Sequence, residues 1–194
     1  MTEHAPPAQR FAASPAAQAI AVAWGCAEAI AWFVIPDVWG AWVVLMAPRR
    51  IGSTLASIVA GALAGSLVLS GIVALTGGIG QVLVALPGIG QADLAQAASE
   101  LQASGPPAML GGVLQGLPLK VYVHEAALLH VSLPGVLLFA LLNRIERVGL
   151  SLLVAAGVGL LLRRLVAARP WLATAGYVVV WAVIYVAYFS SRGL

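Results

Sequence analysis

The sequence predicts an all-α integral membrane protein with two oppositely facing re-entrant helical hairpins, each followed by a transmembrane helix, and a C-terminal transmembrane helix. The first observation is composition: 61% of the 194 residues are hydrophobic, 9% are charged, and the mean hydropathy is +0.99, which is typical of a membrane-embedded chain. The second is that two apolar stretches, 28–37 and 116–125, each contain a proline with charged residues nearby. Such breaks persist at membrane depth only where protein or water covers them, and paired breaks point to a transporter binding site.

The first hairpin is predicted over 15–47, after an N-terminal tail, 1–14, that is flexible or lies on the surface. Helix 15–35 should end before Pro36, because proline disfavours the α conformation at the preceding residue. A second helix, 36–47, then starts with Pro36 at its first position. Its length is about 18 Å, which is too short for a hydrocarbon core of about 30 Å. The segment should therefore enter and leave the membrane on one side.

Residues 51–76 are predicted to form the first full span. Gly61 and Gly65 within it make a face of small residues suited to close helix contact. Residues 77–92 are rich in glycine and proline and should form a loop with one short apolar piece. Residues 93–103 are expected to form a short helix at the membrane interface.

The second hairpin is predicted over 106–131, with its break at Pro118. Segment 135–163 follows and contains charged residues between 143 and 147. One alternative places these charges in a surface turn, but each flanking piece would then be shorter than the roughly 20 residues of a span. No turn signal surrounds the charges, so we predict one long tilted helix over 135–163 and a last span over 171–189.

The distribution of arginines favours a cytoplasmic N-terminus. In this orientation only Arg192 lies outside. The split-helix alternative divides the arginines less unevenly. The arginines placed on the cytoplasmic side are Arg10, Arg49, Arg50, Arg163, Arg164 and Arg169.

Seven ionisable residues fall at the predicted membrane depth, and ions in lipid are expected to pair across the hairpins. Lys120 begins a half-helix, where a cation is disfavoured, so Glu125, Asp37 or a bound anion should compensate it. Arg144 and Arg147 share one helix face, and two adjacent guanidinium groups suit a phosphate. The seven residues are Glu28, Asp37, Lys120, Glu125, Arg144, Glu146 and Arg147.

All of these except Glu146 are candidate substrate- or ion-binding residues, and His124 is a candidate proton relay beside Glu125. A purely structural ion-pair network is the alternative. His124 and His130 are six residues apart and would not share a helix face, which argues against a zinc site. No metal, cofactor or enzymatic activity is predicted. The aromatic residues of 171–188 are interpreted as interface anchors and packing residues.

Several short motifs, in order along residues 20–165, resemble those of the DedA family, also called the VTT or SNARE-associated Golgi protein family. The first hairpin carries Glu28, Pro36-Asp37 and Pro48-Arg49-Arg50, the second carries Pro118-Leu-Lys120-Val121, and Asn143-Arg144-Ile-Glu-Arg147 follows. Leu119 replaces the family's usual aromatic residue, and Asn143 replaces a glycine. The resemblance is to small bacterial members and implies a location in the bacterial inner membrane. It also implies facing re-entrant hairpins and movement of phospholipid or isoprenoid-phosphate lipid between leaflets, often coupled to the proton-motive force.

The sequence therefore predicts a lipid flippase or scramblase whose partners are lipids with anionic or phosphate headgroups, with protons as a candidate second ligand. A proton- or ion-coupled transporter of small solutes and a structural membrane assembly protein remain as alternatives. The net charge of +3 reflects topology and not nucleic-acid binding. A homo-oligomer is left open.

Overall fold

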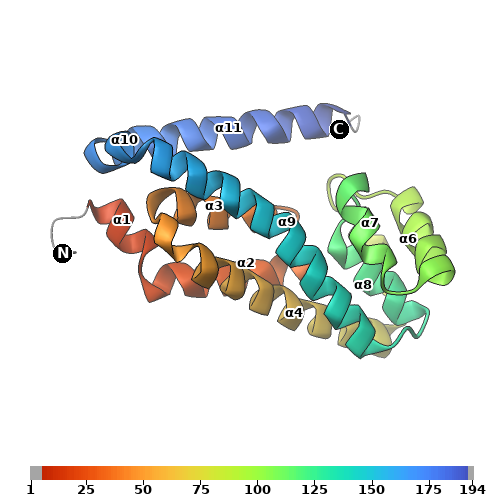
Figure 1. Ribbon diagram of the computed structural model, residues 1–194. Coiled ribbons are helices and arrows are strands. Elements are labelled where there is room, and N and C mark those ends of the chain that lie inside the picture. Colours follow the sequence, from red (N-terminus) through yellow and green to blue (C-terminus); the bar gives the residue numbers. More distant parts are fainter. Residues whose placement is uncertain (1–5, 192–194) are drawn as a thin grey trace.

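The computed structural model describes residues 6–191, apart from the side chains of residues 113 and 114, and in that part of the chain it contains helices and no strands (Figure 1). In chain order the elements are α1 (Pro7–Ala12), α2 (Pro15–Ile30), α3 (Asp37–Met46), the 3₁₀ turn η1 (Pro48–Arg50), α4 (Ile51–Thr76), α5 (Gly80–Val84), α6 (Gln91–Ser104), α7 (Ala108–Gln115), α8 (Leu119–Leu128), α9 (Leu133–Leu161), α10 (Arg163–Ala168) and α11 (Pro170–Ser191).

Helices α2 and α4 pack side by side and run in the same direction. A methyl group on Gly25 would lie 2.5 Å from the carbonyl oxygen of Ile58, and one on Gly61 would overlap the carbonyl oxygen of Val22. Gly65 meets α2 one turn further along both helices. The small-residue face predicted on this helix is therefore its contact with α2, where the two backbones touch.

Helix α9 is unbroken from Leu133 to Leu161, so its charged residues lie in the middle of a helix and not in a turn. It runs antiparallel to α4: its first half packs with the end of α4 in one hydrophobic cluster, and Gly149 lies beside Leu55 near the start of α4. Near its C-terminus, Gly159 approaches the carbonyl oxygen of Leu45 in α3. Helix α9 thus contacts α4 along its length and α3 near its own C-terminus.

Helices α7 and α8 form a second pair beside α9. Gly135 lies next to Pro106, and the Asn143 side-chain amide donates to the carbonyl oxygen of Met109 at 2.7 Å. Contacts therefore advance in the same direction along α7 and α9, and α8 contacts both of these helices. Helix α6 covers α8, where the Tyr122 hydroxyl donates to a carboxylate oxygen of Glu100.

Two helices are long and apolar enough to cross a membrane: Pro48–Thr76, which includes η1 and α4, and Pro170–Ser190 in α11. Their exposure differs, because 44% of the apolar window is buried in the first and 6% in the second. Helix α11 therefore presents most of its apolar surface outward. These two helices indicate association with a membrane.

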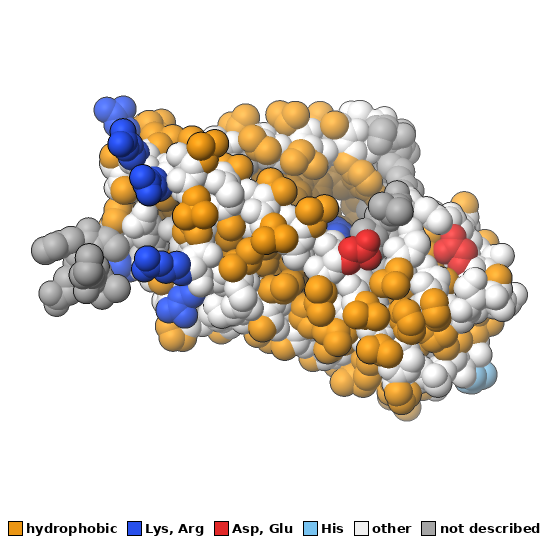
Figure 2. All heavy atoms as spheres, in the orientation of Figure 1, with side chains coloured by type: hydrophobic (Ala, Val, Ile, Leu, Met, Phe, Trp, Pro, Cys, Tyr) orange, Lys and Arg blue, Asp and Glu red, His pale blue; other side chains and the backbone are white. Residues whose placement is uncertain are grey.

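Most of the basic side chains visible in Figure 2 gather at the end of the molecule where α1 and α10 lie. The six arginines predicted to be cytoplasmic come from α1, η1 and the α10 region, and all are exposed. Arg192 lies outside the described residues. The tail prediction falls partly on residues 1–5, which are also outside them. Residues 7–12 form α1, whose Phe11 ring contacts Trp39 and Trp42.

The first helix ends at Ile30, five residues before the predicted end at 35. Pro36 explains a stop at residue 35, but the earlier stop needs partners for the backbone of the intervening loop. The Trp24 indole donates to the carbonyl oxygen of Val34 at 2.9 Å, and the Ile35 amide donates to the Tyr185 hydroxyl at 3.2 Å. These tertiary hydrogen bonds replace the helical ones.

Candidate functional site

The breaks between α2 and α3 and between α7 and α8 meet at the centre of the molecule. Lys120, two residues after Pro118, extends from the start of α8 to the break between α2 and α3. There it donates to the carbonyl oxygen of Trp32 at 3.0 Å. Trp32 lies in the 31–36 loop before Pro36. The two prolines predicted as hairpin breaks therefore flank two non-helical segments joined by a lysine side chain.

Glu28, in the last turn of α2, is the centre of a buried ion cluster. Its Oε1 accepts a hydrogen bond from Lys120 Nζ at 3.0 Å, and its Oε2 accepts one from Arg144 Nη2. All three side chains are at most 3% exposed. The partner of Lys120 is thus Glu28, and the expectation of Glu125 or Asp37 was wrong. Buried charges of opposite sign in hydrogen-bond contact offset part of the cost of their desolvation.

A second ion pair lies one helical turn along α9 from Arg144. Arg147 Nη2 is 3.8 Å from Asp37 Oδ2, which is too long for a hydrogen bond, and this oxygen has no hydrogen-bond partner. Asp37 is 2% exposed, whereas Arg147 is 27% exposed. Both arginines therefore face the cluster, as their three-residue spacing predicts, but only Arg147 also reaches an open space.

The cluster carries an excess of one positive charge, because three cations face two carboxylates. Arg144, one of these three cations, also has unused donors, since its buried Nε and Nη1 atoms have no hydrogen-bond acceptor among the described residues. The protein interior screens charge poorly. The cluster is thus an environment that favours an additional anion, with Arg147 as its most accessible cation.

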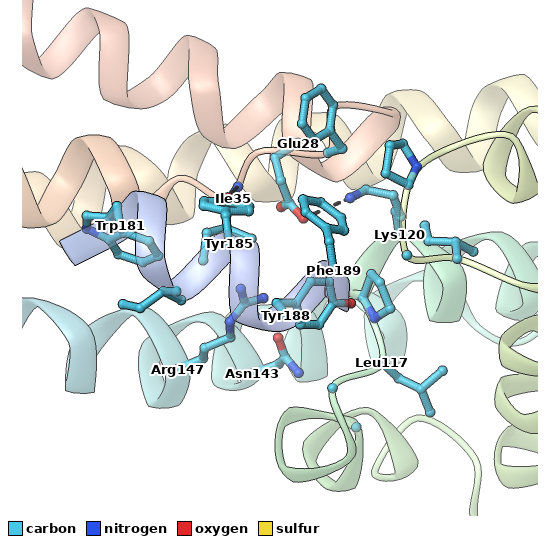
Figure 3. Close-up of a pocket in the computed structure, with 18 residues that line it drawn as sticks. Glu28, Ile35, Leu117, Lys120, Asn143, Arg147, Trp181, Tyr185, Tyr188 and Phe189 are labelled. Atoms are coloured by element: carbon cyan, nitrogen blue, oxygen red, sulfur yellow. Dashed lines mark hydrogen bonds and ion pairs between the residues drawn. The ribbon is translucent and has the colours of Figure 1, made fainter. Parts of the chain in front are cut away.

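A cavity of about 230 Å³ opens beside this cluster. Figure 3 shows Glu28 and Lys120 on one side of it and Asn143 and Arg147 on the other, with aromatic side chains of α11 between them in this view. The remaining lining includes the loop glycines and apolar residues of 87–89 and 116–118. The cavity therefore combines cations and amide groups with an aromatic wall.

His124 and Glu125 lie apart from this cavity. The two side chains interact with each other, with His124 Nδ1 2.9 Å from Glu125 Oε1, while His124 Nε2 accepts a hydrogen bond from the Ile79 amide at 3.0 Å. Both imidazole nitrogens thus have protein partners, and the ring stabilises the loop after α4. The structure does not bring the predicted relay pair to the ion cluster.

Sequence reasoning missed the contribution of α11. Trp181, Tyr185, Tyr188 and Phe189 line the cavity, although these aromatics were interpreted as interface anchors. Their spacing of three to four residues places them on one helix face, and this is the signal that could have found them. Asn143, which stands where the family motif has glycine, also lines the cavity.

Comparison with protein-family models, curated proteins and solved structures gave no match. Within the described residues, no group of three or more His, Cys, Asp or Glu side chains could hold a metal ion. The candidate site is therefore defined by its geometry: an ion cluster with excess positive charge, a cavity and two helix breaks.

Proposed function

We propose that this protein moves lipids with phosphate headgroups between the leaflets of a membrane. The observation that carries this proposal is the position of Arg147, a partly exposed cation that belongs to a positively charged cluster and lines a cavity. A guanidinium group binds phosphate oxygens with two parallel hydrogen bonds. A phosphate headgroup in this cavity would exchange its hydrogen bonds to water for hydrogen bonds to Arg147 and the neighbouring polar groups.

The arrangement of the helices supports a reading of α2–α3 and α7–α8 as re-entrant hairpins. Helix α2 has 16 residues, and α3, α7 and α8 have 10 or fewer, so none reaches the roughly 20 residues of a span. Each pair precedes a long helix that runs parallel to its first member, and the two long helices are antiparallel. This arrangement supports an inverted repeat, in which substrate sites lie between the repeats.

In the same proposal, the protein is a DedA-like transporter of the inner membrane with a cytoplasmic N-terminus. The likeness rests on the short motifs around Glu28, Pro36-Asp37, Lys120 and Arg144 to Arg147, and it is supported by their convergence on one cluster. A structural ion network would explain the paired charges. It would not require a cavity beside them.

The proposal is tested by reconstituting the protein in liposomes with a fluorescent phosphatidylglycerol and measuring exchange between leaflets. Wild type should exceed empty liposomes. Arg147→Gln should slow exchange about tenfold, because one hydrogen bond to a charged group contributes roughly 1.5 kcal/mol or more. Arg164→Gln, which removes an exposed cation at the end of the molecule, is the matched control. Exchange by wild type at the level of empty liposomes, or no effect of Arg147→Gln, would contradict the proposal.

Proton coupling is a second part of the proposal, favoured by Asp37. Its carboxylate is buried, and Oδ2 has only a distant ion-pair partner, so a proton could replace Arg147 as its counter-charge. Asp37→Asn should then remove any acceleration of exchange by a pH gradient while leaving the exchange without a gradient in place. A gradient effect that persists in this variant would exclude Asp37 as the proton carrier.

A further inference from the structure

A second cavity, of about 540 Å³, lies between α9 and α11, with α3 and α10 at its edges. Its lining is almost wholly apolar, including Leu45, Val154, Val158 and Val180. The volume is in the range of roughly 300–1,000 Å³ found for pockets that hold small ligands. Its lining contains no charged side chain, so the ligand that fits it best is hydrocarbon.

The apolar cavity adjoins the polar one along α11. Trp181 and Ile184 line both of them. Arg147 on α9 lines the polar cavity and lies one turn before Ser151, which lines the apolar cavity. A single molecule with a charged end and an apolar end could therefore occupy both cavities.

The way α11 is attached keeps the apolar cavity open toward the surrounding hydrocarbon. Three hydrogen bonds join α11 to α3 and the loop before it: Trp42 donates to Thr174 at 3.2 Å, Tyr177 donates to the Val38 carbonyl oxygen, and Tyr185 accepts from Ile35. On the opposite wall, Val154 of α9 is 61% exposed. A chain can thus enter from the side between α9 and α11.

We infer that the α9–α11 cavity holds the hydrocarbon tail of the same lipid whose phosphate headgroup occupies the polar cavity. The inference rests on the proposed function and specifies where the tail lies during binding. Bilayer hydrocarbon is as apolar as the cavity wall. Moving the tail from the bilayer into the cavity therefore fixes its position but adds little to the binding free energy of the lipid. Selectivity must come from the headgroup, and occupancy of the apolar cavity should therefore depend on the phosphate.

The experiment uses full-length protein in liposomes containing phosphatidic acid with a diazirine at the end of one acyl chain. After irradiation, labelled residues are mapped by mass spectrometry. We expect labelling of cavity residues on α9 and α11. It should exceed labelling by the matching diacylglycerol, which lacks phosphate, by about tenfold, the factor expected from one hydrogen bond to a charged group. Equal labelling by both probes would overturn the inference, because the cavity would then hold only boundary lipid.

Two matched pairs of variants locate the effect. A side chain on Gly176 or on Gly157 meets no atom within 4 Å, but only Gly176 lines the cavity. Gly176→Trp should abolish the labelling that depends on phosphate, and Gly157→Trp should preserve it. Val154→Trp and Leu153→Trp form the second pair, since both residues are more than 60% exposed and only Val154 lines the cavity. Unchanged labelling in both cavity variants would overturn the inference.

Leaflet exchange measured in the same liposomes separates the two proposals. Exchange without labelling of the cavity would refute the tail site and leave translocation standing. Labelling that depends on phosphate without exchange would support the tail site in a lipid-binding protein and refute translocation.

Discussion

At the scale of single residues, the molecule is organised around one carboxylate. Glu28 binds Lys120 through one oxygen and Arg144 through the other, although these residues come from three different helices. Removing one member of a buried ion pair destabilises a protein far more than replacing both members, because the remaining charge is left buried without a partner. Glu28 therefore holds α2, α8 and α9 in register, whatever passes through the adjoining cavity.

Replacing Glu28 tests this role. Glu28→Gln leaves two buried cations without a carboxylate and should lower the free energy of unfolding by about 3–5 kcal/mol, measured by thermal unfolding in detergent. Adding Lys120→Met should recover part of the loss, because one of the two cations is then removed. Glu146→Gln is the control, since Glu146 is an exposed carboxylate on α9. Equal stability of Glu28→Gln and Glu146→Gln would show that the cluster does not stabilise the fold.

At the scale of helices, close contact of backbones fixes the pairing of α2 with α4. Gly25, Gly61 and Gly65 allow the helices to approach until side-chain atoms could not fit between them. Association of helices in lipid depends on such packing, because the hydrophobic effect gives little drive there. This contact fixes where the C-terminal end of α2 lies in space, and with it the position of Glu28.

Gly61→Val should disturb this contact, because its first side-chain carbon would overlap the backbone of Val22. We expect a loss of about 1–3 kcal/mol in the free energy of unfolding, the usual cost of overpacking. Gly71→Val is the matched control on the same helix, where no atom lies within 4 Å of the added carbon. The comparison is made by thermal unfolding in detergent. A Gly61→Val protein as stable as Gly71→Val would refute the packing.

At the scale of the whole molecule, charge is segregated along the long axis. Exposed arginines gather at the end formed by α1, η1 and α10, and α4 runs from this end to the other (Figures 1 and 2). Because basic residues remain on the cytoplasmic side, the arginine end should face the cytoplasm.

Single cysteines test this orientation in a Cys26→Ala background. Arg50→Cys and Arg164→Cys replace exposed residues at the arginine end, and Gln102→Cys and Ser132→Cys replace exposed residues at the other end. A maleimide that does not cross membranes, added to intact cells, should label only the second pair, and the first pair should react after lysis. Labelling of all four in intact cells would contradict a single transmembrane orientation.

The sequence by itself determined the local features of this protein. Apolar length set the helices over 51–76 and 171–189, and the lack of turn residues near Arg144 kept α9 continuous. Prolines marked both breaks, although the first begins after Ile30, earlier than Pro36 requires. These features depend on neighbouring residues, which the sequence displays directly. The shared face of Arg144 and Arg147 follows from helical spacing in the same way.

Only the tertiary structure decided which charges meet. Lys120 pairs with Glu28, 92 residues away, and not with Glu125, which binds His124. Such choices depend on how whole helices pack, and no local pattern encodes them. The cavity has the same origin: α11 becomes its aromatic wall because Thr174, Tyr177 and Tyr185 bind α3 and the loop before it. These contacts join segments far apart in the chain.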